Sequence, residues 1–123
     1  MDKAQNTNSK YWESEERTFR FAEGCRDFTK KLPKTIFNLE YSKQLIRSSG
    51  SQAANYIEAN EALSKKDFLL RLKISRKEAK ESRYWLNLLE ISEDINLIEN
   101  HRSLVQESTE LLSILSAIIQ KVE

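Results

Sequence analysis

The sequence predicts an all-α protein, an antiparallel up-down-up-down four-helix bundle, and two observations support this fold class. The 123 residues include only two Gly and one Pro, too few for the many tight turns of a hairpin-rich β protein. Apolar residues recur at helical spacing in four segments joined by short polar links, the pattern of such a bundle. A chain of this length fits one domain, so we expect residues 14–123 to form a single bundle.

The first helix is predicted at about 14–32. Residues 1–13 are polar apart from Tyr11 and Trp12, and we expect them to form a flexible N-terminal arm. The helix should stop before Pro33, because proline disfavours helical backbone in the residue that precedes it. Its inward face is predicted to consist of Phe21, Ala22, Cys25, Phe28, Thr29 and Leu32.

The second helix, about 36–61, combines heptad spacing with a centre of small residues. Residues 48–54 are nearly all small and include Gly50, and Gly in a helix interior costs about 1 kcal/mol relative to Ala. We therefore expect a neighbouring helix to approach closely at Gly50. The predicted seam alternates spacings of four and three residues: Tyr41, Leu45, Ser48, Gln52, Asn55 and Ala59.

The third helix, about 65–92, begins with a capping-box pattern formed by Ser64 and Asp67. Its seam also has heptad spacing with small residues in the middle, around Ala79. The small centres of the second and third helices are therefore expected to pack against each other. The predicted seam is Phe68, Leu72, Ser75, Ala79, Ser82, Leu86 and Leu89.

The fourth helix is predicted at about 99–122, after a short polar link at 93–96. Its apolar residues cover nearly half of the helix circumference, more than one buried stripe requires. The main stripe is Leu104, Leu111, Leu115, Ile118 and Val122, widened by Val105, Leu112 and Ile119.

The composition indicates the cellular compartment in which the protein is expected. No apolar run approaches the roughly 20 residues that cross a bilayer, so we expect no membrane association. The first eight residues lack the apolar centre of a secretory signal. Cys25 is the only cysteine, so an internal disulfide is impossible, which fits a reducing compartment. These features predict a cytoplasmic protein.

The residues of common catalytic and metal sites are missing from the sequence. His101 is the only histidine, and Cys25 lies on an apolar helix face. There is no Gly-rich phosphate loop, and the Glu-x-x-His elements of di-iron bundles are absent. We therefore predict no enzyme activity, no catalytic residue, no metal site and no cofactor.

Three carboxylates near the packed seams, Glu58, Glu78 and Glu81, allow two interpretations. They can form a paired-carboxylate metal site, or they can be polar partners of Arg47 or of a neighbouring helix. Without histidine ligands nearby, pairing is the better explanation.

Several blocks of the sequence resemble one family. The longest is 54–68 (ANYIEANEALSKKDF), preceded by 32–34 (LPK) and 44–48 (QLIRS) and followed by 77–82 (KEAKES) and 84–86 (YWL). Together they resemble the "four helix bundle protein" family, also named the 23S rRNA-intervening sequence protein family. The resemblance covers roughly residues 17–122.

This resemblance implies a small bacterial protein, often encoded inside an intervening sequence of large ribosomal RNA genes. It also implies a homopentamer in which bundles ring an axis. A related protein, the accessory variability determinant of diversity-generating retroelements, is similarly pentameric and binds nucleic acid. The family's molecular role is not established, so the resemblance informs the fold more than the function.

A row of basic residues follows one side of the third helix. It lies about 100° from the seam, where it can neutralise the phosphates of RNA or DNA, or simply solvate an exposed helix face. Both interpretations stay open from the residues alone. The row consists of Lys73, Arg76, Lys80 and Arg83, with Lys65, Lys66 and Lys77 beside it.

The third helix also carries apolar residues on the side of the seam away from the basic row, namely Ile74, Trp85 and Leu88. Monomeric proteins rarely leave such surplus apolar surface exposed, so we predict contact between subunits of a homo-oligomer. Two functions follow. One is a homo-oligomer that binds RNA or DNA backbone, and the other is a scaffold for an unknown protein partner.

Overall fold

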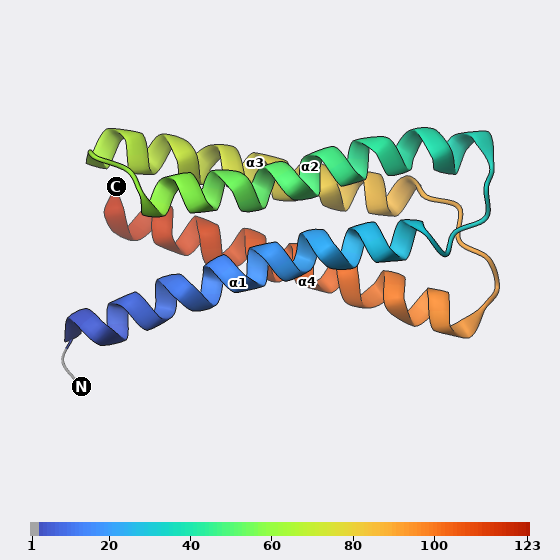
Figure 1. The fold of residues 1–123 in the computed structure, drawn as a ribbon, viewed down its shortest axis with the longest axis horizontal. Helices are drawn as coiled ribbons and strands as arrows, with labels where there is room; N and C mark the ends of the chain where they lie inside the picture. Colours follow the sequence, from blue (N-terminus) through green and yellow to red (C-terminus); the bar gives the residue numbers. More distant parts are fainter. Residues whose placement is uncertain (1–2) are drawn as a thin grey trace.

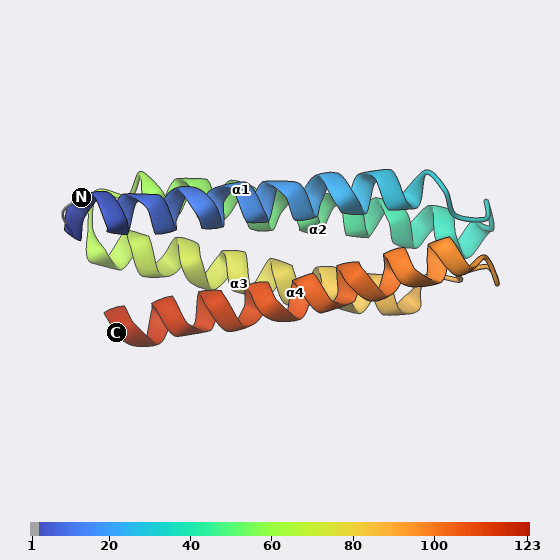
Figure 2. The same cartoon turned by 90° about the horizontal axis from the view of Figure 1, so that it is seen from below.

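The structure, a computed structural model, describes the backbone of residues 3–123 and the side chains from residue 13 onward. It contains four helices and, within these residues, no strand: α1 (Lys3–Thr29), α2 (Ile36–Asn60), α3 (Lys65–Leu88) and α4 (Ile95–Val122). Successive helices run in opposite directions, and the start of α1 and the end of α4 lie at the same end of the bundle (Figures 1 and 2). Helices α1 and α3 each pack against α2 and α4. The predicted antiparallel four-helix bundle is confirmed.

Helix α1 begins at Lys3, well before the predicted start near residue 14. The segment 3–13 contains neither Gly nor Pro, so nothing in it interrupts helical backbone. Helical backbone thus covers most of the predicted arm, and the flexibility of that arm stays a prediction. Met1 and Asp2, and the side chains of Tyr11 and Trp12, lie outside the described residues.

The connection between α3 and α4 differs from the prediction at both ends. Helix α3 ends at Leu88 because the Asn38 side chain binds the backbone of Glu90. Its Oδ1 accepts from the Glu90 N–H at 2.7 Å, and its Nδ2 donates to the Glu90 carbonyl at 2.8 Å. Helix α4 begins at Ile95, inside the predicted link, because Asp94 Oδ1 accepts from the N–H groups of Asn96 and Leu97.

After the other two links, α2 and α3 begin at the residues predicted from the sequence. Thr35 caps α2, its hydroxyl accepting from the N–H of Asn38 at 3.1 Å. The predicted cap of α3 is confirmed, since Ser64 Oγ accepts from the N–H of Asp67 at 3.0 Å. Each cap satisfies a backbone donor that helix geometry leaves free.

The core consists of two apolar clusters with small and polar residues between them. Phe28, Leu45 and Leu86 belong to the cluster near the α1–α2 link, and Tyr56 and Leu72 belong to the other. The residues between the clusters are buried and polar, and most are hydrogen-bonded across helices. They are Thr18, Ser48, Ser49, Gln52, Ser75 and Ser82.

The close α2–α3 contact exists, but the predicted role of Gly50 in it is wrong. Ser75 Oγ donates to the Gln52 carbonyl at 2.7 Å, and Ala79 is completely buried. Gly50 is exposed, and a Cβ added there would have no neighbour within 4 Å. Position 50 lies on the side of α2 that faces away from α3. Close approach occurs instead at Gly24, where an added Cβ would lie 3.1 Å from Leu104 Cδ2.

Candidate nucleic-acid interface

The basic row of α3 lies on the side of the helix that borders α4. Lys73, Arg76, Lys80 and Arg83 are spaced by three, four and three residues, which keeps them on one helix face over about 15 Å. Lys73 and Lys80 are exposed, whereas Arg76 and Arg83 are half-buried. The structure therefore brings together the four residues of the predicted row.

Two arginines of this row donate to hydroxyl groups of α4. Arg76 Nη1 lies 3.5 Å from Ser116 Oγ, and Arg83 Nη1 lies 3.3 Å from Thr109 Oγ1. Both distances are long for a hydrogen bond, so these contacts are weak. They orient the guanidinium groups along the α3–α4 boundary without neutralising their charge.

A neutral polar row on α4 runs beside the basic row. Its members alternate spacings of three and four residues, so they lie along one side of the helix. Thr109 and Ser116 lie next to α3, whereas Gln106 also lines the groove towards α1. The side chains are hydroxyls and amides, which hydrogen-bond but carry no charge. This row was not identified from the sequence, although its heptad spacing is visible there: Gln106, Thr109, Ser113, Ser116 and Gln120.

The carboxylates in the middle of α4 are engaged on the α1 side of that helix. Arg17 of α1 binds Glu107 Oε1 at 2.6 Å and Glu110 Oε1 at 2.9 Å. Hydrogen bonds from Gln106 and Arg17 lower the pKa of Glu110. These acids thus neutralise Arg17 and not the basic row.

One carboxylate does reach the row, at its end. Glu123 Oε2 lies 2.9 Å from Lys73 Nζ, and this hydrogen bond lowers the pKa of Glu123. Both partners are about half exposed, so water and salt screen the pair strongly. Lys80 forms no ion pair among the described residues.

The three flanking lysines do not join the row as closely. Lys65, Lys66 and Lys77 are all exposed. Lys65, at the start of α3, lies near the end of α4, where its charge contributes to the low pKa of Glu123. Lys77 follows Ile74 by three residues and therefore lies with the apolar flank of α3.

The predicted apolar flank is only partly exposed. Leu88 is 38% exposed and Ile74 is half-buried. Trp85 stacks on Tyr41 with ring centroids 5.9 Å apart, and its Nε1 donates to Glu81 Oε1 at 3.2 Å. Much of the Trp85 surface is therefore used within the chain. The participation of these three residues in a subunit contact stays a prediction.

Two of the three carboxylates considered as metal ligands, Glu78 and Glu81, are paired with arginine. Arg47 Nη1 donates to Glu78 Oε2 at 3.0 Å and Nη2 donates to Glu81 Oε1 at 2.7 Å, which confirms the predicted pairing. Burial opposes ionisation of Glu81, but hydrogen bonds from Arg47 and Trp85 outweigh it and lower its pKa. Glu58 is exposed, and the described residues hold no metal-binding group of three His, Cys, Asp or Glu side chains.

Cys25 and His101, the two residues with catalytic potential, are used in packing. Cys25 is completely buried, and burial raises the pKa of its thiol to about 12, although a hydrogen bond with Ser49 acts in the opposite direction. His101 packs against Phe28, and its Nε2 lies 2.8 Å from the Leu86 carbonyl.

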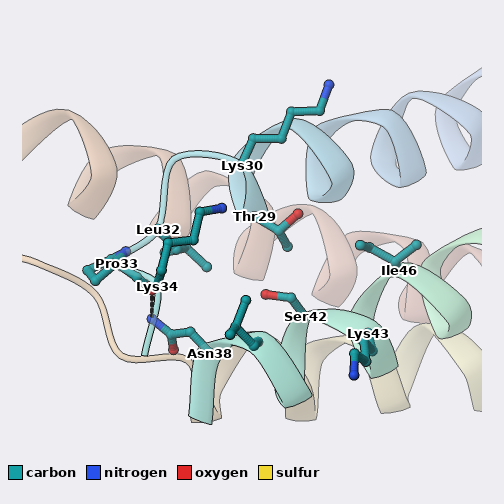
Figure 3. A pocket seen from close by; sticks show the side chains of 10 residues that line it. Thr29, Lys30, Leu32, Pro33, Lys34, Asn38, Ser42, Lys43 and Ile46 are labelled. Carbon is teal, nitrogen blue, oxygen red and sulfur yellow. Dashed lines mark hydrogen bonds between the residues drawn. The ribbon is translucent and has the colours of Figure 1, made fainter. Parts of the chain in front are cut away.

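Two open grooves lie on the outside of the bundle. One, of about 300 Å³, lies between α1 and α4 and includes Arg20, Glu107 and Glu110. The other, of about 260 Å³, lies where the end of α1 meets the first turns of α2 (Figure 3). Ser42 and Ile46 of α2 face this second groove, while the Lys30 side chain extends away from it (Figure 3).

Among the described residues, no helix has the length and apolar character needed to span a bilayer. A profile of the 23S rRNA-intervening sequence protein matches residues 10–117. A crystal structure of a protein with unknown function from the S23 ribosomal protein family of Bacteroides thetaiotaomicron is similar, with 33% sequence identity and a TM-score of 0.75. The similarity covers 90% of this chain and 98% of that chain. No curated protein matches the chain.

Proposed function

The chain belongs to the 23S rRNA-intervening sequence protein family, and on that premise we propose that it is a non-enzymatic homo-oligomer that binds the backbone of RNA or DNA. Binding takes place on the α3–α4 face and involves no reading of base sequence. The observation that carries this proposal is the pairing of a basic row on α3 with a neutral polar row on α4.

The charge balance of this face favours phosphate. Among the side chains that the structure describes, Glu123 is the one carboxylate paired with this row, at its Lys73 end. Lysine and arginine that neutralise phosphates release counterions from the nucleic acid, which drives binding at moderate salt. The remaining α4 groups on this face are hydroxyls and amides, which also donate to phosphate and sugar oxygens.

The arginine contacts also suit a replaceable ligand. Arg76 and Arg83 hold hydroxyl groups at 3.5 and 3.3 Å, and a phosphate oxygen is a stronger, charged acceptor. The phosphates of a nucleic-acid backbone along the α3–α4 boundary can therefore replace the two hydroxyls as acceptors for Arg76 and Arg83 at little cost in free energy. The row itself consists only of lysine and arginine, so we propose contact with the backbone of either RNA or DNA.

Self-association places several copies of this weak site on one assembly. In a homopentamer, the state that the family resemblance implies, five basic rows act on one nucleic acid and raise its effective affinity. The accessory variability determinant, which the family resemblance implies is a related protein, is similarly pentameric and binds nucleic acid, and this is consistent with the proposal. The second candidate function is a scaffold for a protein partner, favoured by exposed apolar side chains such as Phe37 (55%) and Leu63 (100%).

A charge-reversal experiment tests the binding proposal. We expect Lys73→Glu combined with Lys80→Glu to abolish binding of a generic labelled RNA or DNA in fluorescence anisotropy, with the oligomer mass unchanged. Both side chains are exposed, so the substitutions should alter stability by no more than about 0.5 kcal/mol each.

The matched control is Lys31→Glu combined with Lys34→Glu, which makes the same change in charge at the α1–α2 link. Lys31 and Lys34 are exposed, and the control should retain most of the binding. Equal losses in both variants would show that only net charge matters. Unchanged binding in the Lys73 and Lys80 variant, or no wild-type binding at low salt, would favour the scaffold function.

A further inference from the structure

Tyr84 is a large aromatic residue that lies beside the basic row of α3. It is 58% exposed, so much of its ring is accessible from outside the chain. Tyr84 follows Lys77 by seven residues and Lys80 by four, which places the three side chains along one side of the helix. Lys80 and Tyr84 are about 6 Å apart along the helix axis. The lysines of this side of α3 are therefore followed, one turn on, by an exposed aromatic ring.

The Tyr84 ring is held by an aromatic neighbour that leaves part of it uncovered. Trp85 contacts it edge to face, with ring centroids 5.0 Å apart and the planes at 76°. Trp85 is itself fixed by stacking on Tyr41 and by its hydrogen bond to Glu81. In an edge-to-face contact only one face of one ring is covered, so Trp85 leaves at least one face of Tyr84 free. A flat ligand can stack on that face without ordering a mobile side chain first.

The position of Tyr84 around α3 places it on the outer side of the basic row. With 3.6 residues per turn, Tyr84 lies about 40° from Lys80, in the direction away from α4. Of the predicted apolar flank, Leu88 lies one turn beyond Tyr84, whereas Ile74 and Trp85 lie about 80° and 100° away around the helix axis. Tyr84 thus stands between the lysines and that flank.

Exposure alone does not distinguish Tyr84. Phe19 of α1 is 54% exposed, close to the value for Tyr84. Its neighbours three and four residues away are three carboxylates and one alanine: Glu15, Glu16, Ala22 and Glu23. Such a setting repels phosphate, whereas Tyr84 has Lys80 one turn before it. The acid nearest to Tyr84 on α3, Glu81, is paired with Arg47 at 2.7 Å.

An exposed ring beside a row of cations suits a single-stranded nucleic acid better than a duplex. In a duplex the faces of the bases are stacked on one another, so a ring beside the backbone does not reach them. In a single strand a base can turn out and stack on an aromatic side chain while lysine and arginine hold the phosphates. Such stacking tolerates any sequence, because every base has an aromatic face.

We infer that Tyr84 stacks on a base of a single-stranded RNA or DNA whose phosphates are held by the basic row. This rests on the proposed function and names its substrate class, single strands in preference to duplexes. Tyr84 supplies the selectivity for single strands, and the lysines and arginines supply the attraction to the backbone.

Fluorescence anisotropy with three labelled probes of equal length tests the inference: a strand of thymidines, a strand of abasic deoxyribose phosphates, and a duplex. Wild type should bind the thymidine strand at least about fivefold more tightly than the abasic strand, since each base stacked on an aromatic side chain contributes at least this factor. Tyr84→Ala should abolish the difference between these two strands. It should leave the salt dependence of binding unchanged, because no charge is removed.

Three further variants separate stacking from packing and from exposure. Tyr84→Leu keeps an apolar side chain against Trp85 and should lose the preference for thymidine as Tyr84→Ala does, whereas Tyr84→Trp should keep it. Phe19→Ala, the matched control on α1, should also keep it. All variants should retain the wild-type far-UV spectrum and oligomer mass.

The outcomes also distinguish this inference from the proposed function. Equal affinity of wild type for the thymidine and abasic strands, with a steep salt dependence, would overturn base stacking and leave backbone binding intact. Tighter binding of the duplex than of the thymidine strand would likewise overturn the selectivity. Loss of the oligomer in Tyr84→Leu would place the ring in a subunit contact and overturn the inference. No binding of any probe at low salt would overturn both proposals.

Discussion

Ser48 and Ser82 face each other at the centre of the α2–α3 contact, with their Oγ atoms 2.8 Å apart and both side chains completely buried. Side chains this short can meet only where two helix backbones approach closely. Each hydroxyl also lies within hydrogen-bond distance of a carbonyl of its own helix, Ser48 of Leu45 and Ser82 of Glu78. Because each serine has one proton, one of them donates to the other serine and the second donates to its own carbonyl. The small residues of both seams thus permit a close helix crossing in which the serine hydroxyls are hydrogen-bonded, while Gln52 Oε1 is buried without a hydrogen-bond partner.

Enlarging a side chain at this crossing should be costly. We expect Ala79→Leu to lower the free energy of unfolding by about 1–3 kcal/mol, because Ala79 is completely buried and a larger side chain must displace its neighbours. Denaturant titration measures the change. Gly50→Ala, on the exposed side of α2, is the control and should leave stability equal or up to about 1 kcal/mol higher. An unchanged midpoint for Ala79→Leu would contradict the packing.

Arg47 should stabilise the bundle by neutralising two carboxylates of α3. Arg47→Ala leaves the buried Glu78 carboxylate without its cation, and we expect a loss of about 1–3 kcal/mol at neutral pH. Lys43→Ala removes an exposed pair with Glu40 and should change stability by less than about 0.5 kcal/mol. Equal effects of both substitutions would show that the Arg47 contacts contribute nothing beyond a surface pair.

The same interaction has a defined pH dependence. The pKa of Glu81 lies below its ordinary value of 4.5 in the folded chain, so its contribution is present above that value and lost as pH falls through the folded-state pKa. The stability difference between wild type and Arg47→Ala should therefore narrow under acid conditions. A difference that stays constant down to the onset of acid unfolding would contradict this account.

The Cys25 thiol should be unreactive in the folded protein. Its pKa of about 12 keeps it protonated at neutral pH, and it is completely buried, so a thiol reagent reaches it only when the bundle opens. We expect labelling rates to rise with denaturant in parallel with unfolding. Rapid labelling without denaturant would show that the α1 side of the core is open.

The inner seams could be predicted from sequence because one heptad row specifies one buried face. On α3, six of the seven predicted seam residues, from Leu72 to Leu89, are buried, and the seventh, Phe68, packs partly buried against the core. On α2 the predicted seam was also the row that faces the core, since Leu45, Ser48, Gln52 and Ala59 are buried. Gly50 was assigned to the wrong contact because it belongs to the small segment 48–54 but not to that seam.

The candidate interface was only half visible in the sequence. The angular position of Lys73, Arg76, Lys80 and Arg83 follows from helix geometry, but their neighbours depend on how α4 is rotated and shifted against α3. That register places Ser116 and Thr109 beside the arginines. The packing of α1 on α4 likewise brings Arg17 to Glu107 and Glu110. The ends of helices were missed where side chains far along the chain decide them, as Asn38 does for Glu90.

The salt dependence of nucleic-acid binding tests the central claim most directly. Wild-type affinity for a generic RNA or DNA should fall linearly on a plot of log affinity against log salt, with a slope that counts the phosphates neutralised. Lys80→Gln removes one unpaired charge from the row and should reduce that slope by about one for every sequence tested, with the oligomer mass unchanged. A slope near zero for wild type, or a slope that Lys80→Gln leaves unchanged, would contradict phosphate binding by the α3–α4 face.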